Sequence, residues 1–432
     1  MTLNKIFQDK AHKYIPAGCH TYSRCDDSYP LNAPAVLEQG KGSIVSDLDG
    51  NEFIDYGMGL RSVTVGYNYE RISNAAIAQI HNGNNLTRAS KIEIEAAELL
   101  CNLIPWVDMV KFAKNGSTVT SAAIKLSRAY TGKKYVARCA QHPFFSYDDW
   151  FIGDTVMNSG VPDESHALTL QFNFNDILSL EQLFQKYPQQ IAAVILEPAT
   201  TEEPVNGFLQ QVREICTKHG AVLILDEMIT GFRWHLQGAC KYYDVIPDLV
   251  TYGKGMANGF SVAALGGRRE IMNLGGIHHD QERVFLISTT HGAEMCGLGA
   301  FVETMKVYNE LDVVDTIWNN GQQLVDGMNN ISSELGINEY FSVIGTYCSP
   351  NFITKDQAQN ISLEFRTLFM QEMIKNGVLM PWMAIAYEHA QVIDQTLTAV
   401  RHSLNVYKKA LSDGINNYLD GRSIKPVFRK YN

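Results

Sequence analysis

Hydrophobic and polar positions alternate in two different ways along this chain. Between about residues 70 and 305, short apolar runs are separated by stretches whose apolar residues recur every three or four positions. This alternation predicts parallel strands joined by helices, because a parallel strand pair needs a crossover of a dozen or more residues. Beyond about residue 310 the three-and-four spacing dominates, which predicts long helices.

Four stripes of apolar residues with helical spacing predict helix faces that pack in the core rather than functional sites. They comprise Ile92, Ala96, Leu99, Leu100 and Leu103; Val119, Ala122, Ala123, Leu126 and Ala129; Phe208, Val212, Ile215 and Cys216; and Ile393, Leu397, Val400, Leu404, Tyr407 and Leu411.

Three apolar runs each end at a polar or flexible residue. They are IAAVIL (191–196) before Glu197, AVLIL (221–225) before Asp226, and DLVTY (248–252) before Gly253 and Lys254. In an open parallel sheet, ligands bind beyond the carboxyl ends of the strands. We therefore expect Asp226 and Lys254 to face one crevice.

Composition and charge exclude several classes of protein. The 432 residues are 45% hydrophobic and 19% charged, with a formal net charge of −10, which argues against disorder and against a nucleic-acid partner. The N-terminal residues lack the apolar region of a signal peptide, and no apolar run is long enough to span a membrane. The eight cysteines form no C-x-x-C pair, and no histidine pair has metal-ligand spacing. We expect a cytoplasmic protein with reduced thiols and no metal.

A lysine and an aspartate at the mouth of a sheet fit the chemistry of pyridoxal phosphate. That cofactor needs an amine for a Schiff base and a carboxylate beside its pyridine nitrogen. Lys254 and Asp226 are the candidates, although both residue types also end strands simply because water solvates them there. The small residues on either side of Lys254 are expected to leave room for the ring.

A second segment, KNGSTVTSAAIKLSRAYTG (114–132), predicts a phosphate site. Asn115, Gly116 and Ser117 open a helix, where free backbone N–H groups and the positive helix end hold an anion. The alternative is an ordinary helix N-cap by Asn115 or Ser117.

Several motifs together resemble the class III aminotransferases, and most closely the glutamate-1-semialdehyde 2,1-aminomutase branch. They are GSIVSDLDGNEFIDYG (42–57), LSRAYTG (126–132), LEP (196–198), ILDEMITGFRW (224–234), TYGKGMANGF (251–260), LGG (265–267), and NGVLM (376–380) with EHAQVIDQT (388–396). The resemblance implies an α/β protein of the fold-type I pyridoxal-phosphate-dependent transferases. A large, mostly parallel sheet lobe is flanked by helices, and a smaller α+β lobe comes from both termini. The expected parts are 1–65, an N-terminal segment of the small lobe and substrate pocket; 66–310, the cofactor-binding domain; and 311–432, the C-terminal small domain.

By position in these motifs, Lys254 resembles the Schiff-base lysine and Asp226 the partner of the pyridinium nitrogen. Met228, two residues further along the expected strand, resembles the residue that packs on one face of the cofactor; its alternative role is core packing. Phe144 is expected on the opposite face, where relatives often carry Tyr-His-Gly, with Phe145 as the alternative.

The resemblance also implies a homodimer with shared active sites. In FLISTTHGAEMCGLGA (285–300), Ser288 and Thr289 match the stretch in which a threonine from the neighbouring subunit reaches the phosphate. The alternative is an ordinary Ser/Thr loop. In IPAGCHTYSR (15–24), Arg24 matches the position that binds the substrate carboxylate, a role suited to the planar guanidinium; the alternative is a surface arginine.

Departures from the aminomutase pattern lie near the substrate. Where the mutase has Gly-Ser-Trp-Gly-Pro, this chain reads MGLRSV (58–63), so Leu60 and Arg61 are candidate substrate contacts. The segment after Phe144 is also shorter than the mutase's gating loop, and a more open site favours exchange of substrates. We therefore predict an aminotransferase that moves an amino group from an amino acid donor, plausibly glutamate, to an aldehyde or ketone by a ping-pong mechanism.

Three alternatives to this function are open to the sequence. The first is the intramolecular aminomutase reaction. The second is a non-catalytic protein that binds pyridoxal phosphate, which would lose the lysine or the aspartate, and both are present. The third is a nicotinamide dehydrogenase, which the missing G-x-G-x-x-G motif argues against.

Overall fold

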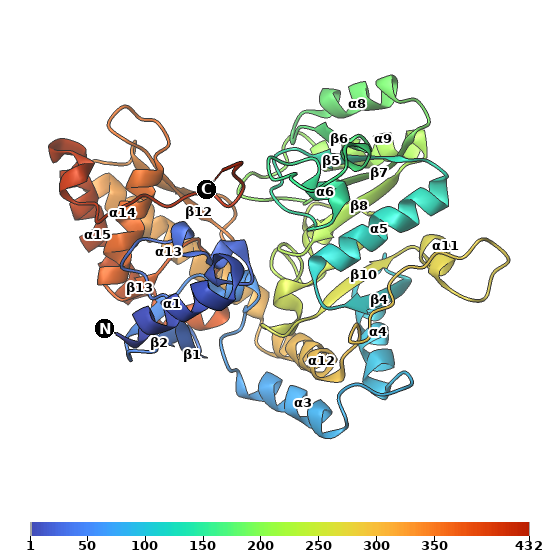
Figure 1. The fold of residues 1–432 in the computed structure, drawn as a ribbon, viewed down its shortest axis with the longest axis horizontal. Coiled ribbons are helices and arrows are strands. Elements are labelled where there is room, and N and C mark those ends of the chain that lie inside the picture. The colour runs from blue at the N-terminus through green and yellow to red at the C-terminus, as the bar shows by residue number, and fades with distance from the viewer. Residues whose placement is uncertain (1, 432) are drawn as a thin grey trace. The chain divides into compact units, whose positions relative to one another are not determined.

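Residues 2–431 are described by a computed structural model, and the chain divides into two units (Figure 1). The terminal unit is Met1–Tyr69 with Asp315–Arg429, so both ends of the chain contribute to it. The sheet unit is Glu70–Val314 with Lys430–Asn432. The sheet unit holds one seven-stranded sheet, and the terminal unit holds two smaller sheets.

A seven-stranded sheet forms the centre of the sheet unit, in the order β4-β10-β9-β8-β7-β5-β6. Its strands are β4 (Met109–Ala113), β5 (Tyr135–Cys139), β6 (Thr169–Phe172), β7 (Ile191–Leu196), β8 (Val222–Glu227), β9 (Leu249–Tyr252) and β10 (Ala263–Gly267). Strand β10 is antiparallel to both of its neighbours, whereas β9, β8, β7, β5 and β6 pair in parallel. The predicted α/β class with a mostly parallel sheet is confirmed.

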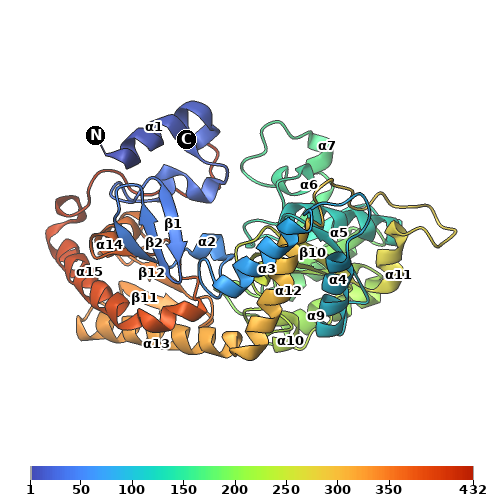
Figure 2. The same ribbon diagram turned by 90° about the horizontal axis from the view of Figure 1, so that it is seen from below.

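Helices cover this sheet. The longer ones are α3 (Glu70–His81), α4 (Lys91–Leu103), α5 (Gly116–Thr131), α8 (Ile177–Lys186), α9 (Phe208–His219) and α12 (Met295–Glu310), and the short ones are α6 (Asp149–Ile152), α7 (Asp163–His166), α10 (Ala239–Tyr242) and α11 (Arg269–Met272). Helix α5 packs across β10, β9, β8 and β7 (Figure 1), so its N-terminus is fixed relative to the strand ends. Helices α3 and α12 lie side by side (Figure 2). The predicted stripes in α4, α5 and α9 supply the buried faces of these helices.

The terminal unit holds two small sheets. Strands β1 (Leu37–Lys41), β2 (Ile44–Asp47), β3 (Glu52–Asp55) and β13 (Val378–Leu379) form one, and β11 (Phe341–Ile344) with β12 (Asn351–Thr354) forms the other. Its helices are α1 (Leu3–Tyr14), α2 (Met58–Arg61), α13 (Val313–Glu334), α14 (Leu363–Lys375) and α15 (Ile393–Asp413). The long helices expected beyond residue 310 are present, but the helical spacing did not reveal the three short strands among them.

Within the described residues, no helix is both long and apolar enough to cross a membrane. The same residues hold no group of three or more potential metal ligands among their His, Cys, Asp and Glu side chains. All eight cysteines are free thiols.

Candidate active site

Asp226 lies in a buried position near the carboxyl end of β8, with 3% of its surface exposed. Its Oδ1 accepts hydrogen bonds from the Thr251 hydroxyl at 2.9 Å and from the Met228 backbone N–H at 3.0 Å. Burial raises the pKa of the Asp226 carboxyl, whereas the charge of Lys254 and these two hydrogen bonds lower it. The carboxylate therefore lies where a neighbouring cation stabilises it strongly.

Lys254 begins a short 3-10 turn, Lys254–Ala257, two residues after β9 ends. Its backbone is left-handed, with φ of 42°. For a residue with a side chain this conformation costs about 1–2 kcal/mol. Strained residues of this kind concentrate at functional sites, where the surrounding structure holds them in place. Lys254 and Asp226 are close enough for their charges to interact, as expected from the two strand ends.

The side chain of Met228 explains two of the neighbouring glycines. A Cβ at Gly253 would lie 2.1 Å from Met228 Cε, and a Cβ at Gly116 would lie 3.0 Å from the same atom. A side chain at Gly253 would therefore displace the end of the Met228 side chain. The spacing from Asp226 predicted that Met228 lies on the same strand. Strand β8 instead ends at Glu227, so Met228 lies in the turn that follows.

The first turn of α5 combines a helix cap with free backbone donors. The Asn115 side chain caps the helix by accepting from the Thr118 N–H at 2.9 Å, which is the ordinary structural role. The Ser117 hydroxyl accepts from the Tyr147 N–H at 3.1 Å and keeps its own hydrogen to donate. The backbone N–H groups of Gly116 and Ser117 have no acceptor within residues 2–431. They are therefore the groups in this turn that an anion can occupy.

The two candidate stacking rings differ in exposure. Phe145 is 2% exposed and packs against His142, Trp150 and Phe151, so the core already occupies its ring. Phe144 is 49% exposed and meets Phe151 edge to face. Of the two, Phe144 has the ring surface that a ligand can cover.

Ser288 and Thr289 lie in an exposed segment without regular secondary structure, six or more residues before α12 begins.

The substrate-binding candidates lie in the terminal unit. Arg24 is exposed at the end of the 3-10 turn Tyr22–Arg24, and Leu60 and Arg61 are half-buried in α2. Burial raises the pKa of Tyr67, and the charge of the nearby Arg24 opposes this rise. Tyr67 in turn binds the backbone of α2, so Arg24 and α2 belong to one neighbourhood.

Sequence reasoning missed two residues around this site. Thr251 faces Asp226 in the parallel register of β9 and β8, a pairing that the two apolar runs do not reveal by themselves. Glu227 is buried next to Asp226 and accepts from the Thr230 hydroxyl at 2.5 Å and from the Ala239 and Cys240 N–H groups at 2.8 and 2.7 Å. It anchors the segment that follows β8. Its position directly after Asp226 was the only available signal.

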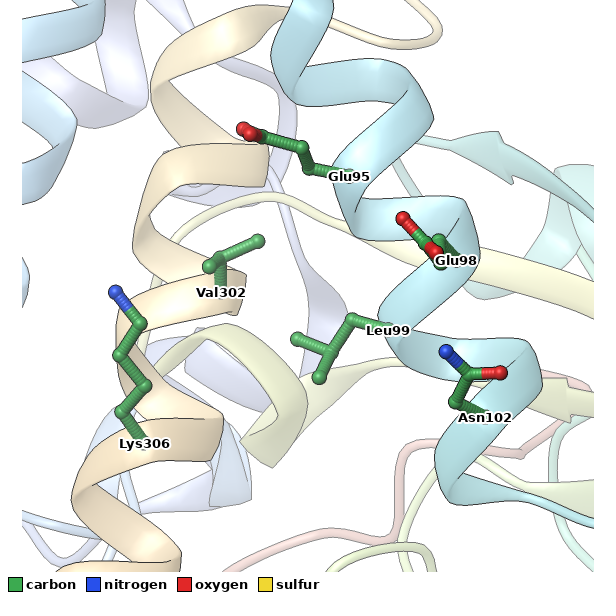
Figure 3. A pocket seen from close by; sticks show the side chains of 6 residues that line it. All are labelled: Glu95, Glu98, Leu99, Asn102, Val302 and Lys306. Carbon is green, nitrogen blue, oxygen red and sulfur yellow. The ribbon is translucent and has the colours of Figure 1, made fainter.

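A separate pocket of about 400 Å³ lies between α4 and α12 (Figure 3). Its lining comprises Glu95, Glu98, Leu99, Asn102, Val302 and Lys306. None of these residues belongs to the candidate site.

The sheet-unit residues fit pyridoxal phosphate on their own chemistry. Gly116 and Ser117 offer donors for a phosphate, Phe144 offers a ring face, and buried Asp226 offers a carboxylate for a protonated ring nitrogen. Lys254 offers the amine, from a left-handed backbone conformation.

Comparison with known proteins agrees with this fit. The sequence profile described as "Aminotransferase class-III" matches residues 27–385. A protein named glutamate-1-semialdehyde 2,1-aminomutase 2, from Lachnoclostridium phytofermentans, is 37% identical over 63% of this chain and 67% of its own length. A protein named 3-aminobutyryl-CoA aminotransferase, from Cloacimonas acidaminovorans, is 30% identical over 93% of this chain and 97% of its own length.

Solved structures show the same fold. The FumI protein of Sphingopyxis sp. MTA144, solved in its PLP internal aldimine form, superimposes with a TM-score of 0.86 at 24% identity, over 95% of this chain and 97% of its own. An omega-transaminase from Sphaerobacter thermophilus superimposes with a TM-score of 0.83 at 23% identity, over 93% and 98% of the two chains. This chain therefore belongs to the class III aminotransferase family and is an enzyme that depends on pyridoxal phosphate.

Proposed function

We propose that this enzyme is an aminotransferase that moves an amino group from an amino acid donor, with glutamate as the first candidate, to an aldehyde or ketone. The observation that carries the proposal is the buried Asp226 carboxyl within reach of the Lys254 charge, at the ends of neighbouring strands β8 and β9. Pyridoxal phosphate supplies an aldehyde for the amine and a ring that accepts electrons when a substrate C–H bond breaks.

Each residue of the sheet unit has a distinct task in this proposal. The Lys254 amine holds the cofactor and moves a proton to and from the reacting carbon. Asp226 keeps a proton on the ring nitrogen by pairing with its charge. The N–H groups of Gly116 and Ser117 hold the phosphate, and the Ser117 hydroxyl adds a donor. Phe144 covers one ring face and Met228 supports the other, in contact with Gly253.

In the terminal unit, Arg24 is the proposed carboxylate-binding residue for the donor. Its guanidinium makes no hydrogen bond or ion pair within residues 2–431, although it is charged and lies on an ordered turn. A planar fork that binds both carboxylate oxygens orients the substrate better than a lysine would. Replacing Arg24 by Ala should weaken binding of carboxylate donors and leave cofactor absorbance intact. Unchanged donor affinity would remove this role.

The aminomutase reaction is the second candidate, because relatives of both kinds align with this chain. We favour intermolecular transfer since α2 carries Leu60 and Arg61 where the mutase pattern has Trp and Gly, so the substrate pocket differs. A shorter segment after Phe144 also favours release of the first product. The non-catalytic alternative is disfavoured by the presence of both Lys254 and Asp226.

Incubation of the loaded enzyme with glutamate alone separates the candidates. An aminotransferase should release 2-oxoglutarate and convert the cofactor to its amino form, which changes its absorbance. The matched control is Lys254→Ala, which should bind the cofactor without a borohydride-stable bond and lose activity by about 10³-fold or more. No half-reaction with glutamate or with any other amino acid would leave the aminomutase ahead.

We also propose a cytoplasmic homodimer in which Ser288 and Thr289 of one chain complete the phosphate site of the other. The exposure of both residues supports this arrangement, since a partner chain can reach them. Each active site would then be built from two chains, and dilution should lower cofactor affinity and activity together.

A further inference from the structure

Two cysteines of the N-terminal segment are in contact through their sulfur atoms. The Sγ atoms of Cys19 and Cys25 lie 3.2 Å apart, although six positions separate the two residues in the chain. Both are free thiols, so the contact is a hydrogen bond and not a covalent bond. The sulfur atoms of a disulfide lie about 2.0 Å apart, so formation of the bond needs an approach of only about 1 Å.

A backbone carbonyl determines which thiol donates in this contact. Cys19 donates its S–H hydrogen to the Thr21 carbonyl at 3.2 Å. Because each thiol has a single hydrogen, the hydrogen between the two sulfur atoms comes from Cys25. The Thr21 carbonyl also accepts from the Arg24 N–H at 2.8 Å. The thiol pair is therefore joined by hydrogen bonds to the 3-10 turn that carries Arg24.

The chain on the other side of Cys25 is held by the C-terminal part of the terminal unit. The Lys425 N–H donates to the Asp27 carbonyl at 2.7 Å, and the Arg422 guanidinium donates to the Asp26 carbonyl at 2.7 Å. These bonds come from residues about 400 positions away in the sequence. The fold thus fixes the backbone on both sides of Cys25, and the contact between the two sulfur atoms is part of the folded structure.

The two thiols differ in exposure and in acidity. Cys19 is half-buried, so a small solute can reach its sulfur, whereas Cys25 is buried. Burial, followed by the hydrogen bond with Cys19, raises the pKa of the Cys25 thiol to about 12. The thiolate is the form that reacts with oxidants, so Cys25 is the poorer first target. An oxidant therefore meets Cys19 first, with Cys25 already in contact.

We propose that Cys19 and Cys25 form a reversible oxidation site, at which a peroxide converts the two thiols to a disulfide. Hydrogen peroxide oxidises the Cys19 thiol to a sulfenic acid and is reduced to water. The Cys25 sulfur then attacks the sulfenic sulfur, the S–O bond breaks, and the hydroxyl group leaves as a second water with the Cys25 proton. The two cysteines together lose two electrons, and a thiol reductant restores them by exchange.

The size of the closed loop favours a reversible role over a structural one. The stabilisation that a disulfide provides increases with the length of the loop that it closes. The loop from Cys19 to Cys25 is very short, so the bond would constrain little of the unfolded chain. The loop contains Arg24, so oxidation places a covalent constraint around this residue. The oxidation site does not depend on the reaction that the enzyme catalyses.

Tryptic mapping of the loaded enzyme tests the disulfide directly. Trypsin cleaves between Arg24 and Cys25, so the two cysteines fall in different peptides, residues 14–24 and 25–41, each with one cysteine. The enzyme is treated with hydrogen peroxide, the remaining thiols are alkylated, and digestion is carried out without reductant. The two peptides should be joined, and dithiothreitol should separate them. Absence of the joined peptide, or its presence only in covalently linked dimers on a non-reducing gel, would overturn the proposal.

The same digest measures whether the reaction is selective for this pair. Cys101 in α4 is another half-buried thiol, and burial raises its pKa. The joined peptide should form about threefold or more faster than Cys101 is oxidised, because a raised pKa lowers the thiolate fraction. Cys101→Ser is the matched control and should give as much joined peptide as the wild type. Oxidation of Cys101 at an equal rate would indicate a general reaction of accessible thiols and would sink the proposed site.

Single variants test the order of the two steps. In Cys25→Ser the sulfenic acid of Cys19 has no thiol to attack it, so dimedone, which reacts with sulfenic acids, should label the peptide 14–24. In Cys19→Ser the buried Cys25 should stay unlabelled at the same peroxide concentration. Labelling of Cys25 in the second variant, without labelling of Cys19 in the first, would contradict the assignment of Cys19 as the first target. The mapping of the wild type needs no substitution and tests the disulfide even if a variant fails to fold.

Discussion

Thr251 donates its hydroxyl hydrogen to Oδ1 of Asp226 across neighbouring strands, at 2.9 Å. The two residues are paired in the parallel register of β9 and β8, and both are buried. A buried carboxylate without enough donors has a raised pKa and loses its charge, so this bond helps Asp226 remain an anion. Thr251 therefore supports the group proposed to hold the ring nitrogen.

Replacing Thr251 by Val should remove this support at nearly constant volume. The pKa of Asp226 should rise, and stability should fall by about 1–3 kcal/mol because a buried acceptor loses a partner. Cofactor affinity should fall when measured by titration of its absorbance. Thr251→Ser keeps the hydroxyl and is the control. Equal cofactor affinity in both variants would show that the bond does not serve the cofactor.

The raised pKa of Asp226 predicts how cofactor stabilisation depends on pH. In the cofactor-free protein the folded pKa lies above the unfolded value, because burial outweighs the charge of Lys254 and the two hydrogen bonds. The stability that this group contributes is therefore present below the unfolded pKa and is lost as the pH rises through the folded pKa. A cationic ring nitrogen lowers the pKa of Asp226 and cancels that loss.

The difference in Tm between loaded and cofactor-free protein should therefore increase as the pH rises through the raised pKa of Asp226. The carboxyls of Glu227 and Asp55 also have raised pKa values from burial, but their effect is common to both forms and cancels. Calorimetry at a series of pH values measures the difference. In Asp226→Asn the difference in Tm should be small and nearly independent of pH. If the difference rose with pH in this variant as much as in the wild type, Asp226 would be excluded as the cause.

Much of this arrangement follows from local sequence. The run 191–196 forms β7 without change, and the apolar stripes of α4, α5 and α9 are buried as their spacing requires. These elements are predictable because burial on one face, or on both faces of a strand, leaves its pattern in the nearby sequence. The strand ends then bring Asp226 and Lys254 near each other by topology alone.

Other features depend on partners that are remote in sequence. Strand β13 is two residues long and exists because it pairs in parallel with Ile54 and Asp55, more than 300 positions earlier. The left-handed turn of α2 has little local signal, since Leu60 and Arg61 favour ordinary helix, and it depends on bonds from Asp55 and Tyr67. Sequence analysis identified Leu60 and Arg61 as candidates only because they depart from a family pattern.

Substitution of the two adjacent phenylalanines should separate cofactor binding from folding. Phe145→Ala removes a ring that is 2% exposed, and should lower the free energy of unfolding by about 3–5 kcal/mol. Phe144→Ala removes a half-exposed ring and should cost about 1 kcal/mol or less. It should nevertheless weaken cofactor binding by about 3- to 10-fold through lost stacking. The measurements are chemical unfolding without cofactor and absorbance titration with it. The reverse pattern would move the stacking role to Phe145.

Mixed dimers test whether Thr289 serves the partner's active site. Lys254→Ala should inactivate the site in its own chain, whereas Thr289→Ala should weaken phosphate binding in the site of the other chain. When the two variants are unfolded together and refolded, a mixed dimer contains one site with intact Lys254 and an intact Thr289 from its partner. The mixture should then regain up to about a quarter of wild-type activity, because about half of the dimers are mixed and each has one complete site.

The activity expected of the mixture is lower if Thr289 acts within its own chain. No site in a mixed dimer would then contain both intact residues, and the mixture should show no more activity than the average of the two variants. Assays at low cofactor concentration make the contrast largest, since Thr289→Ala affects affinity rather than chemistry. A mixture of Lys254→Ala with Asp226→Asn is the control: both residues lie in the sheet unit near each other, so this mixture should not recover. Recovery in the first mixture alone requires Thr289 to cross from one chain to the other.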